Sequence, residues 1–290
     1  MTLKLAFLGL GVMGYPMAGH LANKTDALVT VYNRTPAKAA SWQRQYNGQT
    51  ARMPADAVAQ ADYVFICVGN DNDLEQILTG AEGVIQAVRP GTVIIDHTTV
   101  SADISRKMAC LFKKRGVNFL DAPVSGGQSG AEKGALSVMI GGDQGAFDHV
   151  APLIRQAYGK EVRRIGVSGT GQMAKMINQI CIAGVVQGLA EAMAFGQKAG
   201  LDMEEVLSVI SKGAAQSWQM ENRAATMLQG KFDFGFALDW MIKDLGIALD
   251  EARRQGIDLP NTEIVQGYYR ELSAQGHGRL DTSALIKRLR

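Results

Sequence analysis

Short apolar runs alternate with more polar, helix-compatible stretches over the first 165 residues. Six runs have the length and composition of buried strands: KLAFLGLG, ALVTVYN, YVFICVG, TVIIDHT, NFLDAPV and LSVMIGG. The stretches between them have the length of crossover helices, and Thr35 and Ser101 stand at two of the expected N-caps. This alternation predicts parallel βαβ units, and therefore an α/β domain over residues 1–165.

The pattern changes after Val167. A long stretch with helical apolar periodicity and no proline follows, GTGQMAKMINQICIAGVVQGLAEAMAFGQKAG, and strand-like alternation almost disappears beyond it. We expect helices over residues 171–198, 203–212, 218–228, 237–255 and 261–274, with Gly200, Gly256 and Gly276 as stop signals. The second domain, residues 166–290, is therefore predicted to be all-helical.

Three glycines follow the first predicted strand in the order Gly-x-Gly-x-x-Gly. Gly9 permits a tight turn, Gly11 permits close approach of a pyrophosphate, and Gly14 permits close packing of the helix that follows. The free N–H groups at the start of that helix suit phosphate oxygens. We therefore expect a Rossmann-type dinucleotide-binding domain, in which the whole turn contacts the cofactor: Gly9, Leu10, Gly11, Val12, Met13 and Gly14.

The end of the second predicted strand distinguishes the two nicotinamide cofactors. A carboxylate there would bind the ribose 2′-hydroxyl of NAD and repel the 2′-phosphate of NADP. The chain has Asn33, Arg34 and Thr35 at this position, which offers a guanidinium and a hydroxyl to a phosphate. We predict NADP, with NAD as the alternative, since Arg34 could be merely solvated and Thr35 merely a helix cap.

Two further strand ends lie where open α/β sheets bind ligands. Val68, Asn70 and Thr98 are candidates there for the path from adenosine to nicotinamide. Asp96 and Thr99 are equally consistent with turn and cap residues. His97 beside them is more typical of a structural or an exposed histidine than of a catalytic one, and no role is assigned to it.

Composition narrows the range of partners. A net charge of +2, from 30 basic and 28 acidic side chains among 290 residues, gives no surplus for nucleic acid, so a small molecule is expected. Cys67, Cys110 and Cys181 are scattered, which predicts neither a metal site nor a disulfide framework. We find no signal-peptide pattern and no segment that reads as a bilayer span, and expect a cytoplasmic protein without membrane contact.

Hydride transfer needs a group that exchanges the substrate's hydroxyl proton. Lys175 and Asn178 are three residues apart and share one face of the predicted long helix, so both could meet one ligand. The segment DAPVSGG adds the hydroxyl of Ser125 and the backbone N–H groups of Gly126 and Gly127, which could hold a carboxylate. A lysine that reaches the surface and an ordinary glycine-rich loop are the alternatives, each about as well supported by the segment alone.

Six motifs in order resemble the β-hydroxyacid dehydrogenase family, which includes 3-hydroxyisobutyrate dehydrogenase and tartronate semialdehyde reductase: GLGVMG, NRT, DHTTVS, DAPVSGG, GTGQMAKMINQ and WMIKDLGIALDEA. The resemblance covers essentially the whole chain. It implies that Lys175 is the catalytic acid/base, that Thr98 contacts the nicotinamide and that Lys243 reaches the cofactor. The substrate-binding residues that it implies are Ser125, Gly126, Gly127, Asn178, Trp218 and Asp244. NRT resembles the members that use NADP.

Several alternative interpretations of these residues and of the function remain open. Lys243 and Asp244 could be a solvated charged pair on a helix, and Trp218 could be a core residue. The expected function is hydride transfer between NADP(H) and a small β-hydroxy acid or its semialdehyde. The alternatives are an imine reductase, which usually lacks the lysine, and a non-catalytic dinucleotide-binding sensor. The apolar helical domain suggests a homodimer or homotetramer.

Overall fold

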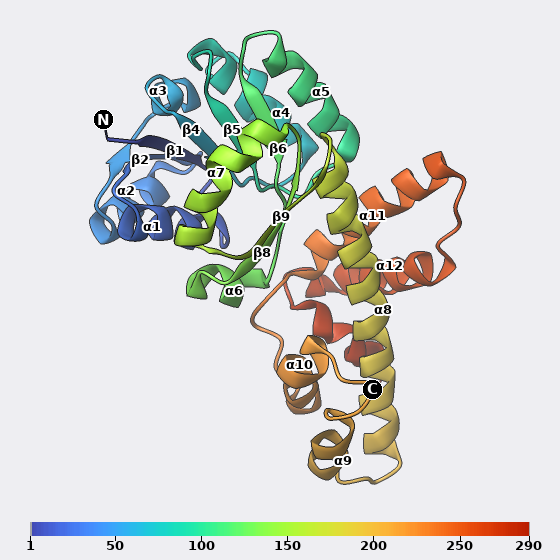
Figure 1. Ribbon diagram of the computed structural model, residues 1–290. Coiled ribbons are helices and arrows are strands. Elements are labelled where there is room, and N and C mark those ends of the chain that lie inside the picture. Colours follow the sequence, from blue (N-terminus) through green and yellow to red (C-terminus); the bar gives the residue numbers. More distant parts are fainter. Residues whose placement is uncertain (1, 290) are drawn as a thin grey trace. The chain divides into compact units, whose positions relative to one another are not determined.

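A computed structural model describes residues 2–289 of the chain. The chain forms two compact units, one that runs to Lys175 and one that starts at Met176. The first unit is a sheet with helices, and the second is built from helices (Figure 1). The first unit ends at Lys175, and the second unit begins at Met176.

The sheet of the first unit has the order β3-β2-β1-β4-β5-β6-β8-β7, with β9 paired to β8. The strands from β1 to β6 pair in parallel, whereas β8 runs antiparallel to β6 and β7 and parallel to β9. Their bounds are β1 (Lys4–Leu8), β2 (Leu28–Tyr32), β3 (Gln49–Thr50), β4 (Tyr63–Ile66), β5 (Val93–Asp96), β6 (Asn118–Asp121), β7 (Val124–Ser125), β8 (Leu136–Gly141) and β9 (Gly159–Gly166).

Helices cover both faces of this sheet (Figure 1). Phe7 of β1 packs on one side, in a cluster with residues of α1 (Gly14–Lys24), α2 (Pro36–Gln45), α6 (Gly127–Lys133) and α7 (Gln144–Ala157). Ala6 and Leu8 pack on the other side, with α3 (Pro54–Val58), α4 (Asp71–Thr79) and α5 (Ala102–Lys113), and a short 3-10 turn, η1, spans Val84–Gln86. Alternate residues of one strand thus enter two cores, which is why the parallel strands are apolar throughout.

The parallel arrangement predicted for the whole first unit fails at β8. The helix between β6 and β8 is α6, which has seven residues and is about 10 Å long, so it cannot span a return along a strand of about 20 Å. The chain therefore turns back through β7 into an antiparallel neighbour. Three strands, β3, β7 and β9, were not predicted. The first two have two residues each, and β9 buries only Gly159 and Val162, so it shows no strand-like alternation.

Only one of the two expected N-caps makes its hydrogen bond. The hydroxyl of Ser101 accepts from the backbone N–H of Ile104 (3.2 Å), as predicted for α5. Thr35 does occupy the position before α2, but its side chain makes no capping hydrogen bond among the described residues. The N-cap position expected of Thr35 is thus confirmed, with the extended backbone (φ −96°, ψ 104°) typical of such a residue, and only the side-chain hydrogen bond is missing.

The second unit is helical, as predicted. The helix α8 (Thr170–Lys198) runs into it from the first unit, and it continues with α9 (Met203–Ile210), α10 (Trp218–Gln229), α11 (Leu238–Gln255), α12 (Pro260–Leu272), a π turn η2 (Ser273–His277) and a 3-10 segment η3 (Thr282–Leu289). The five predicted helices agree with these bounds to within two residues. Gly256 ends α11 in the left-handed conformation (φ +70°), as its stop signal required.

The expectation that no segment has the length and composition of a bilayer span is wrong for α8, which is long and apolar enough by these two criteria. Its buried side is occupied by the core of the second unit, to which it contributes Ala183, Val186, Leu189, Ala190 and Met193. A core helix passes the same test, and the packing of these residues explains the apolar sequence.

Candidate functional site

The glycine turn after β1 has the geometry that each glycine was expected to serve. Gly9 has φ +99°, and a Cβ there would lie 2.2 Å from the carbonyl oxygen of Cys67. A Cβ on Gly14 would lie 2.0 Å from the carbonyl oxygen of Gly9, so the start of α1 packs directly on the turn. A Cβ on Gly11 meets nothing within 4 Å. The turn is thus closed at Gly9 and Gly14 and open at Gly11, as a cradle for a dinucleotide must be.

Asn33, which was expected to meet the cofactor, braces the glycine turn. Its Oδ1 accepts a hydrogen bond from the backbone N–H of Leu10 (2.8 Å), and its Nδ2 donates to the carbonyl oxygen of Thr35 (3.1 Å). The side chain thereby ties the end of β2 to the turn. Sequence reasoning could identify the missing carboxylate at this position, but not this bracing contact.

The side chain of Arg34, which follows the end of β2, is exposed to solvent. Its side chain is 83% exposed and pairs with Asp73 in the first turn of α4 at 3.3 Å. An exposed ion pair of this kind stabilises little, so the guanidinium can exchange Asp73 for another anion at small cost.

Val68, Asn70 and Thr98 make hydrogen bonds that order the ends of β4 and β5. The backbone N–H of Val68 donates to the hydroxyl of Thr98 (3.1 Å), and Thr98 is buried. Asn70 caps α4 by accepting from the N–H of Asp73 (2.9 Å). Asp96 accepts from the N–H of Thr98 (3.0 Å), which agrees with the turn residue considered for it. Burial raises the pKa of Asp96 to about 7.

His97 is a structural histidine. Its Nδ1 lies 2.6 Å from the carbonyl oxygen of Ala122, so this nitrogen carries the proton and donates. Its Nε2 therefore accepts from the hydroxyl of Tyr158 at 2.7 Å, and the ring stacks on Phe65. Burial lowers the pKa of His97 to about 4, so the ring is neutral at physiological pH.

Lys175 is buried, with 7% of its surface exposed, and its Nζ donates to the carbonyl oxygen of Val124 at 2.8 Å. The alternative of a lysine that reaches the surface is therefore wrong. Val124 directly precedes Ser125, Gly126 and Gly127, so the ammonium group lies at the base of the segment expected to hold a carboxylate. Gly126 and Gly127 have φ +133° and +59°, and a Cβ on Gly127 meets nothing within 4 Å.

Two residues that sequence reasoning missed hold α8 at the sheet. The carboxylate of Asp121, at the end of β6, accepts from the backbone N–H groups of Gly169 (2.7 Å) and Gln172 (3.1 Å), and burial raises its pKa. The side chain of Gln172 donates to the carbonyl oxygen of Thr98 (2.7 Å) and accepts from the N–H of Val100 (3.2 Å). The ends of β5 and β6 and the first turn of α8 thus form one hydrogen-bonded network. Both residues stand inside recognised motifs, but their partners are distant in sequence.

In the second unit, a chain of polar side chains connects Asn178 to Lys243. Nδ2 of Asn178 donates to Gln179 (2.8 Å), Nε2 of Gln179 donates to Asp244 (2.7 Å), and Nζ of Lys243 lies 3.2 Å from Asp244. The Asp244 side chain is 2% exposed, so the alternative of a solvated charged pair is wrong for it. Gln179 was not predicted, because only the fold brings it to Asp244.

Trp218 begins α10 and is 50% exposed, so the alternative of a core tryptophan is also wrong. The guanidinium of Arg223 lies 5.0 Å from its ring centroid and 4.6 Å from that of Phe234. Arg223 is itself held by the buried carboxylate of Asp281 (3.2 Å). The second unit therefore presents an aromatic side chain at its surface, with the guanidinium of Arg223 over the ring.

Comparisons with known proteins agree with this geometry. Residues 4–169 match the family described as the NAD binding domain of 6-phosphogluconate dehydrogenase. Residues 169–289 match the family described as NAD-binding of NADP-dependent 3-hydroxyisobutyrate dehydrogenase. Both parts of the chain thus belong to nicotinamide-dependent oxidoreductases.

Individual relatives align over nearly their whole length. An uncharacterized oxidoreductase of Shewanella frigidimarina is 58% identical over 286 residues, which cover 99% of this chain and 98% of that protein. The 2-hydroxy-3-oxopropionate reductase of Escherichia coli is 35% identical over 287 residues, covering 99% and 97%. The solved structure of the Mycobacterium tuberculosis 3-hydroxyisobutyrate dehydrogenase with L-serine has a TM-score of 0.89 and 31% identity, with 100% of both chains covered.

The chain belongs to the β-hydroxyacid dehydrogenase family. It is an oxidoreductase that acts on hydroxy acids with a nicotinamide dinucleotide, and the open turn at Gly11 fits that cofactor.

Proposed function

We propose that this enzyme transfers a hydride between NADP(H) and a small β-hydroxy acid or its semialdehyde, with Lys175 as the general acid/base. The hydrogen bond of Lys175 to Val124 carries the proposal, because it places a buried amine next to the Ser125–Gly127 segment. The cofactor supplies or accepts the hydride at its nicotinamide ring.

Lys175 exchanges the second hydrogen of the reaction, which is a proton. In oxidation, the neutral amine takes the hydroxyl proton of the substrate as the hydride leaves the carbon, and in reduction the ammonium returns a proton to the carbonyl oxygen. The hydroxyl of Ser125 and the backbone N–H groups of Gly126 and Gly127 bind the substrate carboxylate. Asn178, one helical turn after Lys175, holds the oxygen that reacts. Trp218 and Asp244 as substrate residues, and Lys243 as a cofactor residue, rest on the family resemblance.

Replacing Lys175 by alanine tests the proton transfer. We expect kcat to fall by about two to four orders of magnitude, the usual contribution of general acid/base catalysis, while NADPH still binds. Binding is followed by the fluorescence of NADPH. Lys198→Ala removes an exposed lysine from the other end of α8 and serves as the control. Turnover near the wild-type rate in Lys175→Ala would contradict the role.

The choice of NADP rests on Arg34 and Thr35. Arg34 is exposed beside the glycine turn, and Asn33 adds no negative charge that would repel a 2′-phosphate. Arg34→Ala should lower the ratio of kcat/KM for NADP to that for NAD by about tenfold or more, the value of one charge-assisted hydrogen bond. Arg44→Ala, which removes an exposed arginine of α2, is the matched control. An unchanged ratio means that Arg34 does not select the cofactor.

A direct screen tests the reaction as a whole. 3-Hydroxyisobutyrate and L-serine are offered with NADP and NAD, and 2-hydroxy-3-oxopropionate with the reduced cofactors, while absorbance of the reduced nicotinamide is followed. A cyclic imine with NADPH tests the imine reductase alternative, which Lys175 and the Ser125–Gly127 segment disfavour. Turnover of the imine without turnover of any of the three acids would overturn the proposal. Absence of all turnover would favour the non-catalytic sensor, which the family membership disfavours.

The active form is further proposed to be a cytoplasmic homodimer or homotetramer. Ile177, Val185 and Phe195 are exposed apolar residues on α8, and burying such residues stabilises association. Sedimentation velocity of the purified protein measures the oligomeric state, and a monomer at assay concentration would contradict this part. Cell fractionation tests the location.

A further inference from the structure

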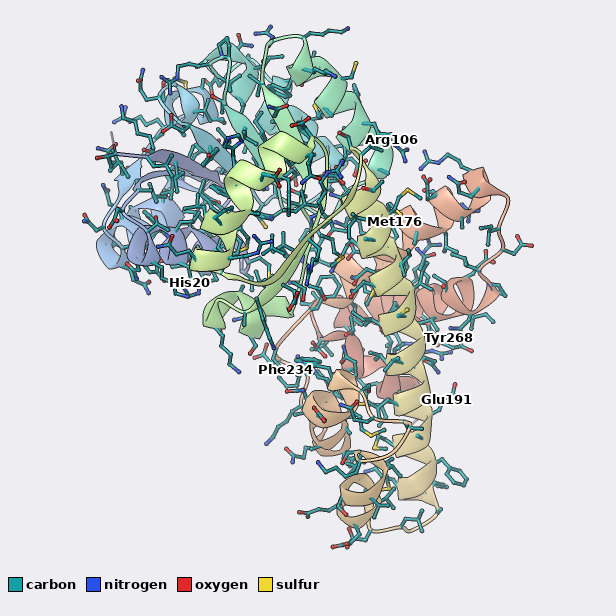
Figure 2. All side chains as sticks on the ribbon, in the orientation of Figure 1. His20, Arg106, Met176, Glu191, Phe234 and Tyr268 are labelled. Atoms are coloured by element: carbon teal, nitrogen blue, oxygen red, sulfur yellow. The ribbon has the colours of Figure 1, made fainter. Side chains whose placement is uncertain are left out.

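His20 makes a contact that neither the cofactor turn nor the proposed chemistry explains. It lies on α1, the helix that begins at Gly14, and its Nε2 is 3.0 Å from the carbonyl oxygens of both Ala131 and Glu132. Both partners are acceptors, so Nε2 carries a proton and donates to the last turn of α6. His20 lies on the side of the first unit where α1, α6 and α7 come together (Figures 1 and 2).

The neighbouring turn of α1 makes a similar contact with a different helix. Lys24 donates to the carbonyl oxygen of Ala157, the last residue of α7, at 2.9 Å. Helix C-termini leave carbonyl groups without partners in the helix and attract donors and cations. His20 and Lys24 thus satisfy the ends of two helices from one face of α1. A Cβ on Gly134, the residue after α6, would lie 2.7 Å from Nζ of Lys24, so the packing there is close.

Besides His20, the last turn of α6 is held by the residues that follow it: the backbone N–H of Ala135 donates to the carbonyl oxygen of Gly130 (2.8 Å). Ala131 is its one fully buried residue, so apolar packing contributes less to α6 than to its longer neighbours. The helix begins at Gly127, directly after Ser125 and Gly126, and Ser125 is fixed to β8 by its pairing with Ser137. Because α6 is short and stiff, a rotation of its C-terminal end changes the backbone at Gly126 and Gly127.

We propose that His20 is a positioning residue for the substrate: it fixes α6, and α6 orients the backbone N–H groups of Gly126 and Gly127. This inference rests on the proposed function of the Ser125–Gly127 segment. The helix α1, which begins at Gly14 of the glycine turn, thereby also sets the geometry of the Ser125–Gly127 segment. Neutral and protonated imidazole both keep the Nε2 proton when the neutral ring is in that tautomer, so the contact does not require a charge.

Steady-state kinetics of four variants test the inference, with the best substrate among 3-hydroxyisobutyrate, L-serine and 2-hydroxy-3-oxopropionate. His20→Ala should raise KM for that substrate by about fivefold, the worth of one net hydrogen bond, and leave kcat and KM for NADP within about twofold. His20→Gln, whose amide can donate from nearly the same place, should restore KM. Lys24→Ala, which loses a hydrogen bond to α7 and none to α6, should leave KM unchanged. Ser125→Ala should raise KM whatever His20 does.

Amide hydrogen exchange of residues 126–134 is measured without substrate. Together with the kinetics, it distinguishes the positioning role of His20 from the proposed substrate-binding role of the Ser125–Gly127 segment. Faster exchange in His20→Ala, together with a raised KM and rescue by His20→Gln, supports the inference. Unchanged exchange refutes it, whatever the kinetics show. Faster exchange with an unchanged KM also refutes it, provided that Ser125→Ala raises KM, and the proposed substrate segment then stands. If Ser125→Ala leaves KM unchanged, the proposed segment fails and the role of His20 fails with it.

Discussion

Asp96, the last residue of β5, carries a fully buried carboxyl group, and Asp96→Asn tests what this burial costs. Its Oδ1 accepts from the N–H of Thr98, whereas Oδ2 has no hydrogen-bond partner among residues 2–289. Burial raises its pKa from 3.8 to about 7, and the negative charges of Asp121 and Asp71 add to the effect. The asparagine keeps the acceptor for Thr98 and cannot ionise.

The sign of the pH dependence follows from the direction of this shift. The folded protein retains a proton at Asp96 that the unfolded chain has already lost above about pH 4, so stability falls as the pH rises toward 7. A shift of about three pKa units corresponds to about 4 kcal/mol of unfolding free energy. We therefore expect the wild type to lose about this much, relative to Asp96→Asn, between pH 4 and pH 7.

Urea unfolding followed by circular dichroism, at a series of pH values, measures this difference. Taking the difference between the two proteins cancels the titration of the groups that they share and that do not interact with Asp96; Asp121 and Asp71, whose charges raise the pKa of Asp96, titrate as part of the measured difference. Asp26→Asn removes a solvent-exposed carboxylate and controls for the loss of one charge. A difference that stays constant between pH 4 and pH 8 within about 1 kcal/mol would refute the reasoning. Such a result means that solvent or a rearrangement reaches Oδ2.

Two further predictions concern the packing of the first unit. Gly14→Ala puts a Cβ 2.0 Å from the carbonyl oxygen of Gly9, so we expect a loss of about 1–3 kcal/mol in urea unfolding, whereas Gly11→Ala should leave stability unchanged and weaken NADP binding. Equal stability of the two variants would contradict the geometry of the turn. Tyr158→Phe removes the hydroxyl that donates to Nε2 of His97, and leaving that buried nitrogen unpaired should cost about 1–3 kcal/mol without changing kcat. A loss in kcat alone would mean that His97 acts in the reaction.

The sequence predicted the elements whose periodicity is unambiguous and missed those that depend on partners. The long apolar periodicity after Val167 gave α8 to within one residue, because a helix packed along most of its length repeats its buried positions regularly. β9 was missed because only Val162 and the terminal Gly159 of this strand are buried, which leaves no clear alternation. Its place in the sheet comes from pairing with β8.

The residues of the candidate site also fall into those that the sequence could predict and those that it could not. Gly9, Gly11 and Gly14 could be predicted because their conformations depend on nearby backbone. Asp121, Gln172 and Gln179 could not, since each is defined by hydrogen bonds to residues that only the fold brings near. A carboxylate at a strand end and a glutamine in a helix are too common for their type alone to indicate a role.

The position of Lys175 follows from how the start of α8 is satisfied. A helix leaves N–H groups without partners in its first turn, and here the buried carboxylate of Asp121 accepts two of them, from Gly169 and Gln172. Asp121 lies three residues before Val124, the acceptor of Lys175, and Lys175 lies three residues after Gln172. Hydrogen bonds thus connect residues 121–124 to residues 169–175 at two places. Asp121 binds the N-terminal end of α8, and the carbonyl oxygen of Val124 binds Lys175 one helical turn further on. The hydrogen bonds of Asp121 that stabilise the start of α8 therefore also help to hold the Lys175 amine at Val124, the residue before Ser125. All of these residues belong to the first unit, so the position of the amine relative to residues 124–125 is set within that unit.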